Sequence, residues 1–112
     1  MENNNQIQAA IMSPFDLLDE VKEALAITWT EEDNNIVKLI GRSVYYINDL
    51  VGAELDLTVN LVARELVINR IRYEYNNALD QFESNFAQPL SRLIFHVALD
   101  ERKIDDGTGT TP

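Results

Sequence analysis

The sequence predicts a small all-α domain, a bundle of about four helices with flexible termini. A chain of 112 residues is long enough for one hydrophobic core and too short for two. Hydrophobic residues at 46% and charged residues at 25% are ordinary values for a folded globular protein. Apolar side chains recur at helical spacing along most of the chain. We therefore expect a flexible segment over 1–12, one helical domain over 13–103 and a disordered tail over 104–112.

The longest periodic stretch is 57–82, which contains neither Pro nor Gly. Its apolar residues form two adjoining strips on a helix, so the helix presents a wide face that must be covered on more than one side. The first strip is Leu57, Leu61, Ile68, Ile71, Tyr75, Leu79 and Phe82, and the second is Val59, Val62, Leu66 and Tyr73. We expect 57–82 to be the central helix of the bundle.

A second long helix is predicted over 31–51. Thr30 precedes it as a capping hydroxyl, and Gly52 supplies the left-handed stop at its end. Since the connection over 52–56 is short, we expect helix 31–51 to lie antiparallel to the central helix over 57–82.

The first and last helices have clear starting signals. Ser13-Pro14 combines an N-cap residue with a proline at the first helical position, and this helix should end near Ala26. After a loop over 83–89, Pro89 should open the last helix. A short strand over 95–97 is the second interpretation of that region.

Acidic residues dominate the charge of the chain. Nine Lys and Arg oppose nineteen Asp and Glu, so the formal net charge is -10. Such a chain should be repelled by nucleic-acid phosphates. We interpret the acids mainly as a solvated surface, and a second interpretation is a wall that faces DNA without binding it.

Three adjacent acids, Glu31, Glu32 and Asp33, stand where the second helix begins. The helix dipole favours negative charge in a first turn, so we interpret them as helix-start residues. A calcium loop would also need a central Gly and a distal Glu at set spacing, which this stretch lacks. They are candidate solvated or channel-facing acids.

Arg64, Arg70 and Arg72 form the densest basic cluster of the chain. We favour ion pairs within the subunit, either with Glu65, Glu74 or with the acidic first half, over pairs with carboxylates of a neighbouring subunit. Trp29, between two predicted helices, is more often a core residue at such a position, but it is also the first candidate for an interface anchor. All four residues are therefore candidate interface residues.

No catalytic constellation emerges from the sequence. His96 is the only histidine, in an apolar run, and there is no cysteine. Disulfides and thiolate metal sites are thereby excluded. No apolar run is long enough for a membrane span, and the N-terminus lacks the pattern of a secretory signal. We expect a cytoplasmic protein that is no enzyme, needs no cofactor, and works through its surface.

A series of features in chain order carries a family resemblance. They are Leu25 and Ile27, the acidic turn Thr30 to Asp33, then Ile36, Leu39, Ile40 and Tyr46-Ile47, the stop at Gly52, then Ala63 and Asn69-Arg70, and finally Pro89-Leu90 and Leu93-Ile94. This order resembles that of the head-tail connector, or head completion, proteins of tailed bacteriophages over about residues 14–99. The chain departs from the family at Arg42-Ser43, where Ala-Ala is common, and at Val67-Ile68, where an aromatic residue precedes the Asn-Arg pair.

The resemblance implies a structural virion protein at the head-tail interface, made in the cytoplasm of the host bacterium. Its copies would form a ring, usually twelve-fold, below the portal protein and would dock the next head-completion or tail protein. DNA would pass through the ring without specific binding, and no membrane would be involved. The alternative is an acidic helical regulatory protein, of the anti-repressor or antitoxin type, that binds a basic protein surface.

Overall fold

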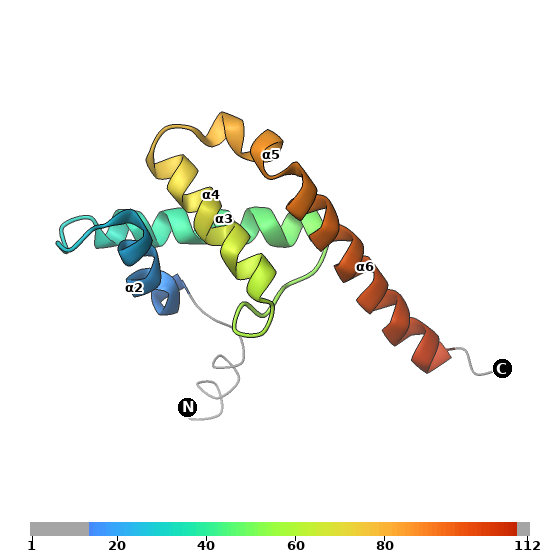
Figure 1. Ribbon diagram of the computed structural model, residues 1–112. Helices are drawn as coiled ribbons and strands as arrows, with labels where there is room; N and C mark the ends of the chain where they lie inside the picture. The colour runs from blue at the N-terminus through green and yellow to red at the C-terminus, as the bar shows by residue number, and fades with distance from the viewer. Residues whose placement is uncertain (1–13, 110–112) are drawn as a thin grey trace, which may run out of the picture.

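The computed structural model describes residues 14–109 of the chain, and the side chains of residues 17–102. Within that range the structure is all-helical, as predicted, and contains no strand. The elements are α2 (Pro14–Leu25), α3 (Asp33–Val51), α4 (Leu61–Tyr75), the 3-10 turn η1 (Leu79–Gln81), α5 (Phe82–Asn85) and α6 (Ala87–Gly109) (Figure 1).

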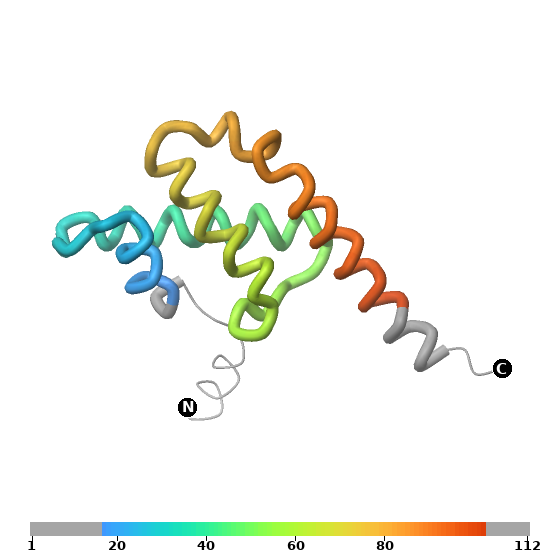
Figure 2. The backbone as a smooth tube through the Cα atoms, viewed as in Figure 1, coloured from blue at the N-terminus to red at the C-terminus, as the bar shows by residue number. Residues whose placement is uncertain are grey.

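Helix α3 lies in the middle of the fold. Helices α2, α4 and α6 all contact it, and Figure 1 shows α4 crossing α3 obliquely between α2 on one side and α6 on the other. The expected antiparallel pairing of 31–51 with 57–82 is not confirmed in that form, because α4 runs back across α3 at an oblique angle (Figure 1). The tube in Figure 2 shows the same order, with α6 extending away from the other helices.

The expected central helix over 57–82 is wrong at both ends, because asparagine side chains and turns limit it. Asp56 accepts a hydrogen bond from the backbone N–H of Thr58 at 2.9 Å, which fixes a turn. Asn60 then caps α4 by accepting from the backbone N–H of Ala63 at 3.0 Å. The helix consequently begins at Leu61.

Helix α4 ends at Tyr75 through a left-handed residue. Asn77 has φ 59°, and the N–H of Ala78 donates to the carbonyl of Tyr73 at 2.8 Å. This bond and the one from Asn77 N–H to the Glu74 carbonyl (3.1 Å) form a Schellman motif. Asn adopts this conformation more readily than most residues, so two consecutive asparagines stop a helix whose apolar pattern continues.

Helices α2 and α3 end as predicted, both on left-handed residues. Ala26 has φ 60°, and the N–H of Ile27 donates to the Lys22 carbonyl at 2.8 Å. Gly52 has φ 73° and its N–H donates to the Asn48 carbonyl at 2.9 Å. Glycine adopts this conformation without steric cost, whereas alanine does not.

Two predicted helix starts have different outcomes. Helix α2 includes Pro14 at its first position, and Ser13 lies outside the described residues. Helix α3 begins at Asp33, and Thr30 contributes its carbonyl, which accepts from the Asp33 N–H at 3.1 Å. The expected hydroxyl cap by Thr30 is therefore wrong, since the chain makes one turn before the helix begins.

The predicted loop over 83–89 and the alternative strand over 95–97 are both wrong. Residues 82–85 form α5, and α6 begins at Ala87 and continues through the expected strand. Pro89 lies in the first turn of α6. Backbone N–H groups in a first turn have no partner within the helix, so a proline there removes no helical hydrogen bond. Helix α6 reaches Gly109, past the expected start of the tail; the expectations for residues 1–12 and for the last three residues fall outside the described range.

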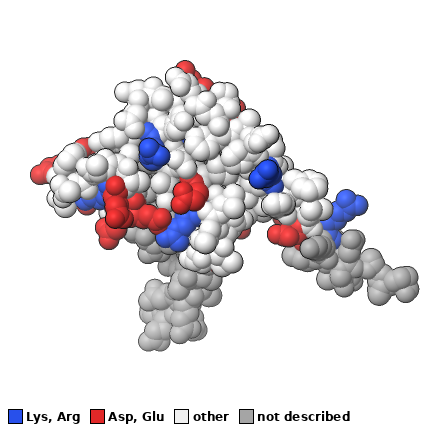
Figure 3. All heavy atoms as spheres, in the orientation of Figure 1, with Lys and Arg blue, Asp and Glu red and all other residues white. Residues whose placement is uncertain are grey.

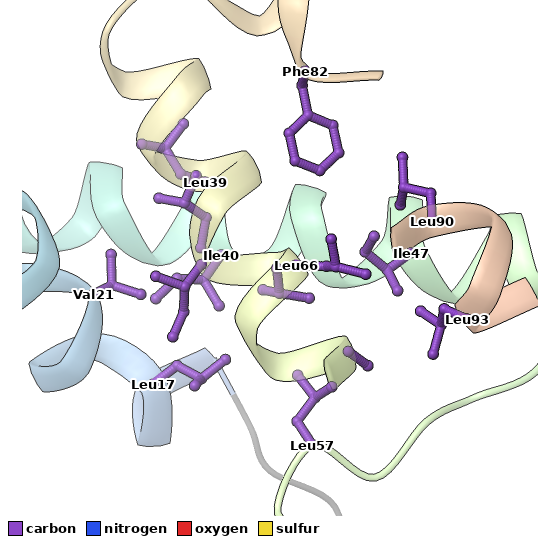
Figure 4. Packing of buried hydrophobic residues seen from close by; sticks show 14 of the residues in the cluster. Leu17, Val21, Leu39, Ile40, Ile47, Leu57, Leu66, Phe82, Leu90 and Leu93 are labelled. Atoms are coloured by element: carbon purple, nitrogen blue, oxygen red, sulfur yellow. The ribbon is translucent and has the colours of Figure 1, made fainter. Parts of the chain in front are cut away.

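One hydrophobic core joins the helices. Figure 4 shows side chains from α2, α3, α4 and α6 pointing toward one another, with Phe82 above them. The Phe82 ring is 1% exposed and contacts three aromatic rings, with centroid distances of 4.9 Å to Phe86, 5.8 Å to Tyr73 and 6.3 Å to Tyr46. These contacts explain why the short segment after α4 is ordered against the core.

The molecule is flat, with principal extents of 58 × 43 × 17 Å. Its radius of gyration is 16.0 Å, larger than the roughly 13 Å typical of a compact chain of this length. The projecting end of α6 in Figure 1 accounts for the difference. A flat shape leaves much apolar surface uncovered.

Candidate interaction surface

A groove separates the beginning of α4 from α6. Three adjoining hollows of about 440, 740 and 390 Å³ form it, and Val62 lines all three. Pro89 and His96 of α6 line the side opposite Leu61 and Val62. We call this feature the α4–α6 groove.

Large aliphatic side chains lie exposed in the α4–α6 groove. Val59 is 73% exposed, Leu61 61% and Val62 55%. The sequence-based expectation that these three residues belong to a buried face is wrong. The turn at 57–60 turns Val59 outward, and no other described element covers the first turn of α4. Apolar groups gathered in a hollow are typical of protein-binding surfaces.

One end of the α4–α6 groove is acidic. Glu54, Asp56 and Asp100 line the hollow that also contains Val59 and Leu61. Figure 3 shows an uncharged stretch of surface between the acidic side chains beside α2 and the charged groups of α6. The groove therefore offers an apolar floor with three carboxylates at this end, while Arg92 and Glu65 line its other two hollows.

Helix α6 carries apolar residues on two sides. Leu90, Leu93 and Val97 are buried against the core, whereas Phe95 is 60% exposed and Leu99 36% exposed. A helix that packs against a core with a single side requires just one apolar face. The second face of α6 is therefore available for contact with another molecule.

Trp29, predicted as a core residue or an interface anchor, lies in the turn between α2 and α3 and is 44% exposed. Its indole N–H donates to Glu32 at 2.8 Å, and the hydroxyl of Tyr75 donates to the same carboxylate at 3.1 Å. Partial burial and the hydrogen bond to Glu32 raise the pKa of Tyr75. Glu32 thus connects the turn to the end of α4.

The other two acids of the turn have different surroundings. Glu31 is exposed. Asp33 is half-buried and pairs with the Lys22 ammonium of α2 at 2.7 Å. Of the three candidate acids, Glu31 is exposed, whereas Glu32 and Asp33 are partly buried and make contacts within the subunit.

Arg64 and Arg72 both belong to α4, but their side chains contact different partners. Arg64 pairs with Glu20 of α2, its Nε donating at 3.0 Å. Arg72 is exposed and donates to the side-chain oxygen of Asn69 at 3.1 Å. The favoured interpretation, pairing with the acidic first half, is confirmed for Arg64.

Arg70 is the most enclosed of the three arginines. Its guanidinium lies 4.4 Å from the centroid of the Tyr46 ring, donates to the hydroxyl of Ser43 at 3.0 Å and pairs with Glu74 at 3.5 Å. Ser43 is fully buried, so Arg70 satisfies its hydroxyl. Burial, the hydrogen bond to Glu83 and the charge of Glu83 together raise the pKa of Tyr46 to about 12.

None of the candidate interface residues lines the three hollows of the α4–α6 groove, whether Trp29, Arg64, Arg70 or Arg72. The groove residues Val59, Leu61 and Val62 were missed because helical periodicity assigns them to the core. The available signal was the width of the apolar face on 57–82, more than its neighbours can cover.

The described residues include no cluster of three or more His, Cys, Asp or Glu side chains placed to hold a metal ion. None of the described helices is long and apolar enough to cross a membrane. No family model, no curated protein and no solved structure matches the chain.

Proposed function

We propose that this protein is a structural subunit that works by binding other protein subunits. The observation that carries the proposal is the α4–α6 groove, in which Val59, Leu61 and Val62 are each more than half exposed. Complete burial of such a side chain contributes about 1.5–3 kcal/mol, so covering three of them would supply a useful part of a binding energy. A free subunit gains nothing from exposing them.

The kind of assembly follows from the family resemblance. Like the head-tail connectors of tailed bacteriophages, the protein would form a ring, usually twelve-fold, below the portal protein. It would extend the DNA channel, dock the next head-completion or tail protein, and reside in the virion at the head-tail interface. The net charge of -10 suits this role because DNA must pass the ring without being held.

The test is to mix the purified chain with the portal protein encoded in the same genome and to image the particles by electron microscopy. We expect a ring of density coaxial with the portal. Val62→Arg should abolish the ring, because a guanidinium would replace an apolar group in the groove. Tyr45→Arg is the matched control, since Tyr45 is 72% exposed on α3 and the substitution adds the same charge.

Absence of added density across a range of protein and salt concentrations would refute the connector assignment. If the chain instead bound a basic protein, with an affinity that falls steeply as salt rises, the alternative regulatory function would be supported. That alternative requires the acids to form one continuous face. Exposed acids occur on α2, α3, α4 and α6, among them Asp19, Asp49, Glu65 and Glu101, and Figure 3 shows acidic side chains gathered beside α2.

A further inference from the structure

Successive residues of α6 are rotated by about 100° around the helix axis, so different residues face the core, the groove and the solvent. Leu93 and Val97 are buried against the core. His96 and Asp100 line the α4–α6 groove. Phe95 and Leu99 are exposed on the side of α6 opposite Leu93 and Val97, where they follow the groove residue Arg92 at helical spacing.

The outer side of α6 combines apolar and basic groups. Phe95 is 60% exposed and Leu99 36% exposed. Arg102 is exposed and follows them at helical spacing, three residues after Leu99 and seven after Phe95. We call Phe95, Leu99 and Arg102 the outer stripe.

The groove and the outer stripe are complementary. The groove has an apolar floor that includes Val59 and Val62, and Glu54 and Asp100 lie at its acidic end. The stripe has two apolar side chains followed by a guanidinium. In a chain with more than twice as many acids as bases, an exposed arginine next to unpartnered apolar groups is well suited to another acidic copy.

We propose that the outer stripe of one copy binds in the α4–α6 groove of the next copy. Within one subunit Phe95 and Leu99 are exposed and do not fill the subunit's own groove, whereas the projecting end of α6 in Figure 1 can reach a neighbour. Arg102 then lies toward Glu54 of the neighbour. The contact joins two different surfaces, so it repeats head to tail and closes into a ring when the rotation allows.

This inference rests on the proposed function in that both require copies to associate, and disulfide cross-linking tests it separately. The chain has no cysteine, so each introduced thiol is unique. We would mix Leu99→Cys with Val62→Cys under oxidising conditions, alone at high concentration and on the portal. A disulfide forms only when the two Cα atoms approach within about 7 Å.

We expect a covalent dimer from the mixture and a ladder of products from the chain that carries both substitutions. Each single variant alone should give little dimer, because a head-to-tail contact never brings two copies of one residue together. Asp19→Cys with Asp49→Cys is the control pair, since both residues are exposed on other elements. Cross-linking in either condition above the control supports the interface, and none in both conditions overturns it.

Charge exchange adds a second readout. Arg102→Glu should lower the yield of cross-linked dimer by roughly fivefold through like-charge repulsion with Glu54. Adding Glu54→Arg in the same chain should restore the yield. Circular dichroism verifies that the variants remain helical. Failure of the second substitution to restore cross-linking would contradict the pairing of Arg102 with Glu54.

The two proposals fail in different ways. A ring on the portal without the Leu99–Val62 disulfide would leave the connector function standing and overturn this interface. A ladder in solution without portal binding would support the interface and refute the connector function. Strong dimerisation of Leu99→Cys alone would indicate a two-fold contact between outer stripes and overturn the head-to-tail arrangement.

Discussion

Exchanging alanine for glycine should have opposite effects at two positions two residues apart, one inside α2 and one just past its end. Ala24 lies within the helix, whereas Ala26 follows its end with φ 60°. Both are exposed, so neither side chain contributes to the core. We expect Ala26→Gly to stabilise the protein and Ala24→Gly to destabilise it.

The magnitudes follow from backbone conformation. A left-handed conformation costs a residue with a Cβ about 1–2 kcal/mol, and glycine avoids that cost at position 26. Glycine gains freedom in the unfolded chain, which removes about 0.5–1 kcal/mol at either position. The free energy of unfolding should therefore rise by about 0.5–1 kcal/mol in Ala26→Gly and fall by a similar amount in Ala24→Gly.

Urea unfolding followed by circular dichroism measures the difference. With a slope of about 1–3 kcal/mol per molar urea, the two midpoints should move in opposite directions by a few tenths of a molar. The slope itself should not change, since both variants bury the same surface. Equal destabilisation by both substitutions would show that Ala26 is not left-handed and would refute the described end of α2.

Three further predictions concern the core, a helix cap and pH. Phe82→Ala should lower the free energy of unfolding by about 3–5 kcal/mol, as measured by urea denaturation, because the ring is fully buried, and Phe82→Leu should cost clearly less. Asn60→Ala should cost about 1 kcal/mol in the same assay because the cap on α4 is lost, whereas Asn60→Ser should retain most of it; equal losses would argue against the cap. The folded-state pKa of Tyr46 is about 12, above its ordinary value of 10.0. The contribution of this hydroxyl to the free energy of unfolding is therefore fully present below pH 10 and is lost as the pH rises through 12. After discounting for solvent screening, the free energy of unfolding should fall by on the order of 1 kcal/mol over this pH range. In Tyr46→Phe that fall should be absent. If the free energy of unfolding depended on pH identically in both proteins, the role of the Tyr46 hydroxyl would be contradicted.

Local signals predicted the parts of the fold that depend on local chemistry. Pro14 and Gly52 mark a helix start and a helix end because their backbone preferences act within a few residues. The all-helical class followed from apolar spacing alone. The limits of α4 were missed because Asn60 and Asn77 are polar residues that helices also tolerate, and only their hydrogen bonds reveal caps.

The α4–α6 groove was missed for a different reason. Periodicity shows that Leu61 and Val62 are apolar at helical spacing, but it does not show whether another element covers them. Coverage depends on where α6 lies, and α6 follows a segment in which the Phe82 and Phe86 rings stack at 4.9 Å, a contact that has no signature in sequence spacing. The ion pair of Arg64 could be predicted more readily, because the first half of the chain is acidic and offers many carboxylates. Glu20 is the carboxylate that pairs with it.

Trp29 is an intrinsic fluorescence probe in the unmodified protein. It is the only tryptophan, and its ring is partly open to water in the turn between α2 and α3. That turn lies at the end of α3 opposite to α6 in Figure 1. Association through the outer stripe and the groove should leave the wavelength of its fluorescence unchanged, whereas a blue shift on ring formation would reveal that the indole itself enters an interface.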